Sequence, residues 1–331
     1  MIIVKTPLRI SFFGGGSDFP KWYLKNSGEV ISAGIDKYTY VSIRKLPTLF
    51  SYKYRLRYFN NEYTYSINKI KHPTIKAILK HMHNDKFGLD IAHSSDLPAQ
   101  SGLGSSSAFT VGLIQGIYNL KKIHIGKYDL AQKAIYIEQD VLKENIGSQD
   151  QFSTSFGGFN NIKFNKRKII VEPMKISNQK LNFFLKSCVL FFTGFSRKAD
   201  EIEKDKIKKL DQNYRLYERI CLITNEAKKN FYSSVNSDKM IDELSKLLNE
   251  SWIVKKNLSE KVSNAPIDEL FKTAMQNGAS AGKLLGAGAG GFILFLTKNS
   301  KNKKKLIEQL KKLQTVEFKL DTLGSHVIYS K

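Results

Sequence analysis

The sequence predicts an α+β protein of two domains with a cleft between them. Three observations support this class: strand-like and helix-like segments are mixed throughout, the composition changes near residues 165–185, and each half contains a glycine-rich segment. A chain of 331 residues is long enough to form two hydrophobic cores. We place the N-terminal domain at residues 1–175 and the C-terminal domain at residues 176–331.

The first half of the chain begins with alternating, strand-like segments and continues with helical ones. Strands are predicted at residues 1–13, 30–45, 54–59, 63–67 and 89–97. A tight turn at Asn60-Asn61 is expected to connect the third and fourth of these strands. Apolar residues at helical spacing predict helices at 72–84, from 108 to 118 and at 128–143. Residues 156–172 return to strand-like alternation around Gly157-Gly158 and a basic turn.

The second half is richer in lysine and in long helical patterns. Strands are predicted at residues 188–193, 292–296, 315–321 and 325–329. Helices are predicted within 198–258 and at 267–277 and 300–313. Gly278 is expected to end the helix 267–277, because glycine adopts the left-handed conformation that follows a helix C-terminus.

The formal charge of +23 is the unusual bulk property of the chain. A positive field of this size attracts nucleic acids and phosphorylated small molecules alike. Neither zinc-finger spacing nor an aromatic RNA-binding signature accompanies it, so no nucleic-acid partner is expected. No apolar run of about 18 residues is present, so no membrane association is expected. The apolar N-terminus alternates like a strand and lacks a cleavage site, which favours a buried first strand over a signal peptide.

The cysteines and histidines do not form a recognisable metal site. Cys188 and Cys221 lie far apart in sequence, as is typical of reduced thiols in a cytoplasmic protein. His81 and His83 lack a further ligand cluster, and we interpret both as surface residues of a helix. His93 lies inside a predicted strand and is interpreted as a core or edge residue.

The most informative segment is DLPAQSGLGSSSAF, residues 96–109, between a predicted strand and a predicted helix. Unpaired backbone N–H groups and the positive end of a helix dipole would face an anion at this point. Gly102 and Gly104 allow the backbone to approach phosphates closely, and three serines add hydroxyl donors or a magnesium ligand. The segment therefore predicts a nucleotide triphosphate site, with a plain connecting loop as the alternative. It has neither the Lys-Ser/Thr ending of a P-loop nor the G-x-G-x-x-G order of a dinucleotide fold.

Two further segments carry polar groups that a packed core does not require. PLRISFFGGGSDFP, residues 7–20, places Arg9 in an apolar strand and Asp18 after three glycines. An edge-strand salt bridge and a turn residue are the structural alternatives. GAGAGG, residues 286–291, leads directly into a strand, which is typical of close approach to a ligand or of a tight packing turn.

A pair of carboxylates completes the set of candidate residues. Glu138 borders the apolar face of the helix 128–143, and Asp150 lies in the polar segment that follows it. Near a phosphate loop, one carboxylate can hold Mg²⁺ while the other orients or deprotonates an attacking hydroxyl. Asp140 and Glu144 compete for either role, and a solvated surface position is the alternative for each.

The order and spacing of these segments resemble the GHMP kinases, the superfamily of galactokinases, homoserine kinases and mevalonate kinases. PAQSGLGSSSA at 98–108 is similar to the phosphate loop of that family, and GSQDQFSTSFGG at 147–158 resembles the segment with its catalytic aspartate. KLLGAGAGG at 283–291 resembles its third, C-terminal glycine motif. The resemblance covers nearly the whole chain. It implies a ribosomal-protein-like N-terminal domain that binds ATP, a ferredoxin-like C-terminal domain, and a requirement for Mg²⁺.

The resemblance also implies a role for individual residues. Asp150 would be the catalytic base or orienting group, Arg9 would lie near the transferred phosphoryl group, and Ser106 and Glu138 would bind Mg²⁺. The residues expected to bind ATP are Pro98, Ser101, Gly102, Leu103, Gly104, Ser105, Ser106 and Ser107. The residues expected to bind the acceptor are Arg9, Gly15, Gly16, Ser17, Asp18, Asp150, Gly288 and Gly290.

Within the family, TPLRISFFGGGSDFPKWY most closely resembles the D-glycero-D-manno-heptose 7-phosphate kinases. Those enzymes phosphorylate the anomeric hydroxyl to give the 1,7-bisphosphate, on the route to nucleotide-activated heptose for surface polysaccharide. Galactokinases have a Glu-His pair where this chain has GGGSD, which argues against galactose. The alternatives are a kinase for another sugar such as fucose, a sugar sensor without activity, and a nucleic-acid-binding module. The sequence leaves open whether the chain forms a homodimer.

Overall fold

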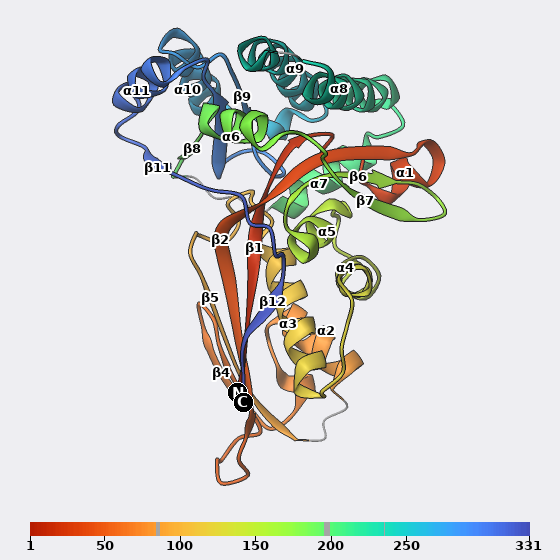
Figure 1. Ribbon diagram of the computed structural model, residues 1–331. Helices are drawn as coiled ribbons and strands as arrows, with labels where there is room; N and C mark the ends of the chain where they lie inside the picture. The colour runs from red at the N-terminus through yellow and green to blue at the C-terminus, as the bar shows by residue number, and fades with distance from the viewer. Residues whose placement is uncertain (84–86, 195–198, 235) are drawn as a thin grey trace.

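The computed structural model describes residues 1–83, 87–194, 199–234 and 236–331. The molecule has an elongated part built on an eight-stranded sheet and a second part built on a four-stranded sheet, counted over the described residues (Figure 1). Helices are associated with both sheets, which confirms the predicted α+β class. The two predicted segments at 72–84 and 198–258 include residues 84, 198 and 235, which lie outside the described residues.

The first sheet is organised around two long strands, β1 (Ile2–Phe13) and β2 (Gly28–Leu46), which pair antiparallel along most of their length. Because β2 spans 19 residues, its two ends reach different neighbours on the same side. β5 (Gly88–Ser95) pairs with its C-terminal end and β6 (Phe159–Phe164) with its N-terminal end. The remaining strands of this sheet are β3 (Tyr54–Arg57), β4 (Asn61–Thr64), β7 (Ile169–Pro173) and β12 (His326–Ser330).

The burial of β1 explains why an arginine in it becomes important. The strand alternates between buried and half-buried residues at its start and is fully buried from Thr6 to Phe13. Three of the helices that contact it are α3 (Ser105–Leu120), α8 (Tyr214–Ser233) and α9 (Ser237–Asn257). Arg9 therefore has to find polar partners inside the molecule, because a buried charge without partners is costly.

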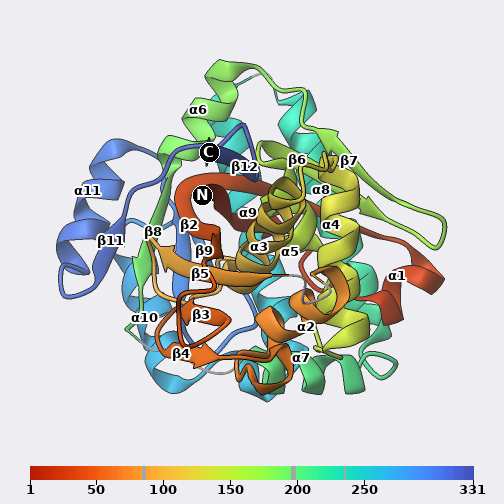
Figure 2. The ribbon, with the colours of Figure 1, turned by 90° about the horizontal axis from the view of Figure 1, so that it is seen from below.

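The helix α3 lies close to the sheet because two of its residues are glycines. A Cβ atom on Gly112 would lie 2.9 Å from Thr6 Oγ1, and one on Gly116 would lie 3.2 Å from Ile43 Cγ2. Figure 2 shows α3 and α5 beside β2, with α4 outside them. The other helices of this part are α1 (Pro20–Asn26), α2 (Pro73–Met82), α4 (Lys127–Ile135) and α5 (Gln149–Phe156).

Several local predictions for this part need correction. The helix predicted at 128–143 ends at Ile135 and continues as a π-helical segment, Tyr136–Val141. The strand predicted at 63–67 ends at Thr64 and is followed by a short 3₁₀ helix, Ile67–Lys69. The interpretation of His83 as a surface residue is wrong: its ring is buried, and Nε2 lies 2.7 Å from the carbonyl oxygen of Phe87.

The second sheet consists of β8 (Cys188–Phe192), β9 (Ala281–Leu284), β10 (Phe292–Leu296) and β11 (Gln314–Val316). Its order is β11-β8-β10-β9, with every pair antiparallel. Numbered within the sheet this order is 4-1-3-2, which is the order of a ferredoxin-like βαββαβ unit. The other helices of this part are α6 (Asn178–Ser187), α7 (Ala199–Lys208), the 3₁₀ turn Glu260–Val262, α10 (Ala265–Gln276) and α11 (Ser300–Gln309).

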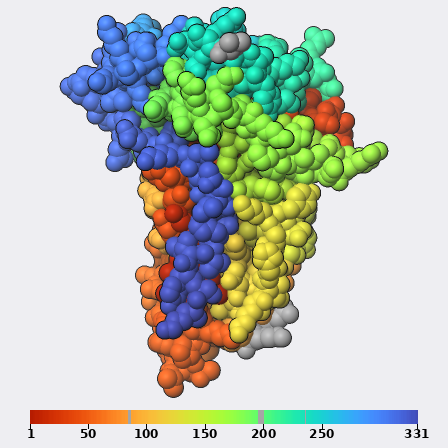
Figure 3. Space-filling model, in the orientation of Figure 1, coloured from red at the N-terminus to blue at the C-terminus, as the bar shows by residue number. Residues whose placement is uncertain are grey.

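The last residues of the chain return to the first sheet. The strand predicted at 315–321 is regular only in Gln314–Val316, after which Leu320 makes an isolated bridge to Ile35. β12 then pairs antiparallel with β1, so both termini lie at the same end of the molecule (Figure 1). Figure 3 shows this C-terminal segment running over the surface from the second part to the first. The division at residue 175 stays a prediction.

The two parts share one hydrophobic core cluster, which runs from β1 and β2 to α8, α9 and β10. Phe12 and Phe13 of β1 belong to the same cluster as Tyr217 of α8 and Leu294 of β10. The two cysteines are free, as predicted. Over the described residues, no helix combines the length and the apolar character needed to cross a bilayer.

Candidate active site

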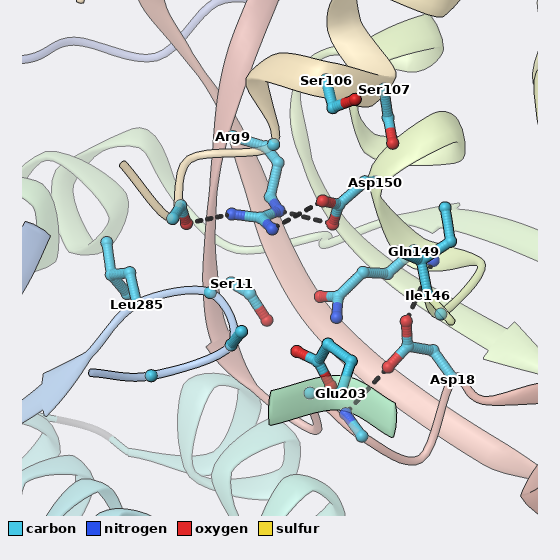
Figure 4. Close-up of a pocket in the computed structure, with 18 of the residues that line it drawn as sticks. Arg9, Ser11, Asp18, Ser106, Ser107, Ile146, Gln149, Asp150, Glu203 and Leu285 are labelled. Atoms are coloured by element: carbon cyan, nitrogen blue, oxygen red, sulfur yellow. Dashed lines mark hydrogen bonds and ion pairs between the residues drawn. The ribbon is translucent and has the colours of Figure 1, made fainter. Parts of the chain in front are cut away.

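A cavity of about 210 Å³ lies between the two parts of the molecule. Its walls come from the end of β1 and the segment after it, the loop before α3, the start of α5, and residues of α7, α9 and β9 with the glycine segment after β9. Figure 4 shows the central residues of this cavity. The predicted site residues that line it are Arg9, Gly15, Gly16, Asp18, Gly102, Gly104, Ser105, Ser106, Ser107, Asp150, Gly288 and Gly290.

The glycine–serine loop, residues 101–107, forms one wall of the cavity. Gly102 and Gly104 have φ angles of +83° and +75°, which glycine adopts without the strain that other residues meet there. Gly104 precedes α3, and no side chain caps the first N–H groups of this helix. The start of a 16-residue helix therefore presents N–H groups and a positive dipole end at the cavity. This arrangement is suited to binding an anion.

Two other residues of the loop hold it in place. The carbonyl oxygen of Leu103 accepts a hydrogen bond of 2.9 Å from the backbone N–H of Arg9, and that of Ser101 accepts one of 2.9 Å from Phe292. Ser101 and Leu103 are buried and tie the loop to β1 and β10. Pro98 is exposed ahead of the loop. Of the predicted ATP-binding residues, Pro98, Ser101 and Leu103 are therefore outside the cavity wall.

An ion pair between Arg9 and Asp150 lies beside this loop (Figure 4). Nε and Nη2 of Arg9 donate to Oδ1 and Oδ2 of Asp150, each over 2.7 Å, and Nη1 donates to the carbonyl oxygen of Gly102 over 2.7 Å. The Arg9 side chain is 5% exposed and that of Asp150 is 23% exposed. Asp150 lies in the first turn of α5, which the sequence did not predict as a helix. This bidentate ion pair fixes the orientation of the Asp150 carboxylate next to the anion-binding loop.

Asp18 forms the opposite wall and is fixed by backbone groups. Its Oδ1 accepts from Gly16 N–H over 2.8 Å and its Oδ2 from Gln149 N–H over 3.2 Å. Burial raises the pKa of Asp18 to about 6, because it outweighs the two backbone hydrogen bonds, and the negative charge of Asp150 adds to the rise. Its neighbour Ser17 is buried and donates to the carbonyl oxygen of Gly14, so it is outside the cavity wall.

Glu138 is buried behind the glycine–serine loop and is also outside the cavity wall. Thr110 Oγ1 donates to its Oε1 over 2.7 Å, and Ser107 Oγ donates to its Oε2 over 3.0 Å. Gln151 Nε2 supplies a third donor. Burial raises the pKa of Glu138 to about 7 in spite of these donors. The π-helical segment that carries Glu138 is a rare conformation that recurs at functional sites.

These residues fit a Mg²⁺ site that phosphates complete. Within the described ranges, no three His, Cys, Asp or Glu side chains are grouped so that they could hold a metal. Mg²⁺ in nucleotide sites is typically held by one or two carboxylates together with substrate phosphates. The exposed Ser106 on the cavity wall and the carboxylate of Glu138 behind it offer oxygen donors of this kind. Of the two competing carboxylates, Glu144 lines the cavity and Asp140 is exposed.

The structure adds residues that the sequence did not single out. Three lysines line the cavity from the second part of the molecule: Lys206, Lys255 and Lys283. Ser11, Gln149 and Glu203 line it as well (Figure 4). Lys283 follows Gly282 directly and Gln149 lies two residues after Gly147, in the segments 283–291 and 147–158, so their positions were a usable signal. Lys206 and Lys255 lie on lysine-rich helices, where nothing distinguishes them from their neighbours.

Comparison with known proteins identifies the family. Residues 68–158 match the GHMP kinases N terminal domain, and residues 231–314 match the GHMP kinases C terminal domain. The chain belongs to the GHMP kinase family, as predicted.

Two relatives and one solved structure describe its place in that family. The chain is 34% identical to the D-glycero-alpha-D-manno-heptose 7-phosphate kinase of Campylobacter jejuni over 325 residues. The aligned region covers 95% of this chain and 94% of that protein. It is 26% identical to the bifunctional fucokinase/GDP-fucose pyrophosphorylase of Arabidopsis thaliana, over 93% of this chain but 31% of that protein. A crystal structure of a D-glycero-D-manno-heptose 1-phosphate kinase from Bacteroides thetaiotaomicron matches with a TM-score of 0.79, 24% identity and full coverage of both chains. The GHMP kinase fold is thereby confirmed.

Proposed function

We propose that this protein is an ATP-dependent kinase for the anomeric hydroxyl of D-glycero-D-manno-heptose 7-phosphate. The product would be the 1,7-bisphosphate, an intermediate of nucleotide-activated heptose synthesis for surface polysaccharide. The observation that carries the proposal is the Arg9–Asp150 pair, which lies at one cavity with the glycine–serine loop and Asp18. The 34% identity to a heptose 7-phosphate kinase over nearly the full length supports the choice of acceptor.

The glycine–serine loop would bind the triphosphate of ATP. Its backbone N–H groups and the start of α3 offer donors that are already fixed before the nucleotide arrives, so little reorganisation is needed during phosphoryl transfer. Mg²⁺, held by Ser106, Glu138 and the nucleotide phosphates, would neutralise charge on the transferred phosphoryl group. Ser107 and Thr110 would keep the Glu138 carboxylate in position through their hydrogen bonds.

Asp150 would orient or deprotonate the attacking hydroxyl. Arg9 holds both oxygens of the Asp150 carboxylate and the carbonyl oxygen of Gly102, so base and loop are connected through one guanidinium group. A hemiacetal hydroxyl is more acidic than an ordinary alcohol, so removing its proton requires less of the base. Arg9 would also compensate negative charge in a loose phosphoryl-transfer transition state.

The acceptor would lie against the segment after β1. Asp18 presents a buried carboxylate that sugar hydroxyls can donate to, and Gly15, Gly16, Gly288 and Gly290 leave room for a close approach. Gln149 lines the same wall beside Asp18 (Figure 4). These contacts fit more than one sugar.

A coupled assay of ADP release with a panel of acceptors tests the proposal. The panel contains D-glycero-D-manno-heptose 7-phosphate, the unphosphorylated heptose, fucose and galactose, each with ATP and Mg²⁺. We expect kcat/KM for the heptose 7-phosphate to exceed that for each unphosphorylated sugar at least about 100-fold. Fastest turnover of fucose would favour the second candidate, a fucose kinase, which the similarity to a fucokinase supports. Binding of ATP and sugar without ADP release would indicate a sensor.

A further inference from the structure

Three lysine side chains converge on the cavity from separate elements of the second part of the molecule. Lys206 belongs to α7, Lys255 to α9 and Lys283 to β9, and all three line the cavity. Lys206 and Lys283 are each 4% exposed, which is rare for lysine. We refer to these three residues as the lysine cluster. It takes no part in the mechanism described above.

The contacts of the cluster leave ammonium donors unused. Lys283 Nζ donates to the carbonyl oxygen of Phe12 over 2.9 Å, and Lys255 Nζ donates to those of Leu284 and Gly286 over 2.7 and 2.6 Å. An ammonium group has three donors, so both side chains have at least one left after these contacts. In the described part of the chain, the single carboxylate paired with the cluster is Glu203, 2.7 Å from Lys206 Nζ.

The cluster therefore brings three basic groups and one paired carboxylate together in a confined space. Burial, together with the positive charges of Arg9 and Lys206, lowers the pKa of Lys283 to about 7. Burial also lowers the pKa of Lys255, with the charges of Lys283 and Lys206 adding to the effect. A bound anion would remove this mutual repulsion and accept the free donors. A phosphate dianion, with several acceptor oxygens, matches a group of three ammonium groups.

The position of the cluster indicates which phosphate it would bind. Lys206 Nζ lies 5.8 Å from the ring centre of Phe19, the residue after Asp18, and Lys283 Nζ donates to the carbonyl oxygen of Phe12, near the end of β1. Glu203, the partner of Lys206, lies across the Arg9–Asp150 pair from Ser106 and Ser107 (Figure 4). The glycine–serine loop and the Lys206 end of the cluster are therefore on opposite sides of the reacting pair.

We propose that Lys206, Lys255 and Lys283 bind the terminal phosphate of a phosphorylated sugar acceptor. The proposal rests on the proposed function in one respect, namely that the acceptor is a sugar phosphate. Its reacting hydroxyl lies at Asp150 and its phosphate at the lysine cluster. The cluster then selects phosphorylated over unphosphorylated sugars, because only the former supply the anion that compensates the buried charges.

Single substitutions Lys206→Met, Lys255→Met and Lys283→Met test the proposal, since methionine keeps much of the aliphatic stem. Each is expected to raise KM for D-glycero-D-manno-heptose 7-phosphate about 10- to 100-fold, the range for loss of a charged hydrogen bond. The kcat/KM for the unphosphorylated heptose and the calorimetric Kd for Mg-ADP are expected to change less than about threefold. Lys204→Met is the matched control, because Lys204 is an exposed lysine of the same helix as Lys206.

Two results would overturn the proposal. An equal loss of kcat/KM with the phosphorylated and the unphosphorylated heptose would show that the cluster does not contact the acceptor phosphate. Weaker binding of Mg-ADP with an unchanged KM for the heptose phosphate would assign the cluster to the nucleotide. Lys255→Met remains informative if a substitution at one of the more buried lysines prevents folding, because Lys255 is only partly buried.

Binding of inorganic phosphate separates this proposal from the proposed function. Calorimetry with inorganic phosphate in saturating Mg-ADP fills the nucleotide site first and needs no turnover. If the wild type binds phosphate and the variants lose it, the cluster is a phosphate site even when heptose 7-phosphate is not turned over. Equal phosphate affinity in the wild type and all three variants would contradict the proposal whatever the sugar.

Discussion

The two walls of the cavity are built in different ways. The glycine–serine loop is one continuous stretch of seven residues that offers backbone N–H groups and hydroxyls at the start of a helix. The opposite wall is assembled from side chains on β1 and the segment after it and on α5, α7, α9 and β9, which are distant in sequence. A site made of backbone groups is thus determined by one short segment of the sequence. A site made of side chains depends on how elements distant in sequence pack together.

The largest effect is expected at the pair between the two walls. Asp150→Asn removes the proposed base and one of the two carboxylate oxygens that accept from Arg9, so kcat is expected to fall at least about 100-fold. Steady-state kinetics with a coupled ADP assay measures this. Asp140→Asn is the matched control, because Asp140 is an exposed carboxylate near the same site in sequence. Near-normal kcat for Asp150→Asn would remove Asp150 from the mechanism.

Gly147→Ala perturbs the acceptor wall alone. The added Cβ atom would lie 1.8 Å from Asp18 Oδ2, so the carboxylate has to move. We expect KM for the acceptor to rise about 10- to 100-fold, the cost of displacing a substrate-positioning group, with an unchanged Kd for Mg-ADP. Gly126→Ala is the control, since its nearest contact would be 3.9 Å away and its φ is −71°. An unchanged acceptor KM would mean that Asp18 does not hold the sugar.

Gly102→Ala is expected to affect nucleotide binding, whereas Gly147→Ala is expected to affect the acceptor. At a φ of +83°, the added Cβ atom would lie 2.6 Å from the carbonyl oxygen of Leu285, so the glycine–serine loop is distorted. We expect Mg-ADP to bind about tenfold more weakly and the free energy of unfolding to fall by about 1–3 kcal/mol. Calorimetry and urea denaturation measure the two effects. Unaltered nucleotide affinity in a folded variant would contradict the assignment of this loop to the nucleotide.

Glu138→Gln tests the smallest effect, a change in the pH dependence of stability. The folded protein holds the Glu138 proton up to about pH 7, whereas the unfolded chain releases it near the ordinary value of 4.5. The wild type therefore binds more protons when folded, and its stability falls as pH rises between these values. Relative to Glu138→Gln, the loss is expected to reach up to about 3 kcal/mol. Urea denaturation of both proteins without nucleotide at pH 5 and 8 measures it, and identical pH dependence would contradict a buried, protonated Glu138.

The sequence was sufficient to predict where the glycine–serine loop lies, because this wall is one continuous segment. Gly102 and Gly104 were found because glycines before a helix have a specific geometric use, and Arg9 because a charge in an apolar strand requires an explanation. The fold class followed from the mixture of periodicities. The helix α5 was missed, because the glycines and polar residues at 147–158 hide its short apolar face.

The lysines of the opposite wall could not be predicted from the sequence, for a physical reason. Lys206 and Lys255 are two among 53 basic residues, and only the packing of α7 and α9 separates them from solvated neighbours. The return of β12 to β1 likewise depends on the sheet edge that β1 leaves open, which no local pattern encodes. Glu138 was predicted to bind Mg²⁺, which stays a prediction, and nothing in the sequence indicated its contacts with Ser107, Thr110 and Gln151.

The most direct test of the whole account is phosphorus NMR of the product formed from D-glycero-D-manno-heptose 7-phosphate, ATP and Mg²⁺. The account predicts one new phosphate ester whose phosphorus couples to the anomeric proton, with the 7-phosphate resonance retained. Phosphorylation at any other hydroxyl, or no new phosphate ester, would contradict it.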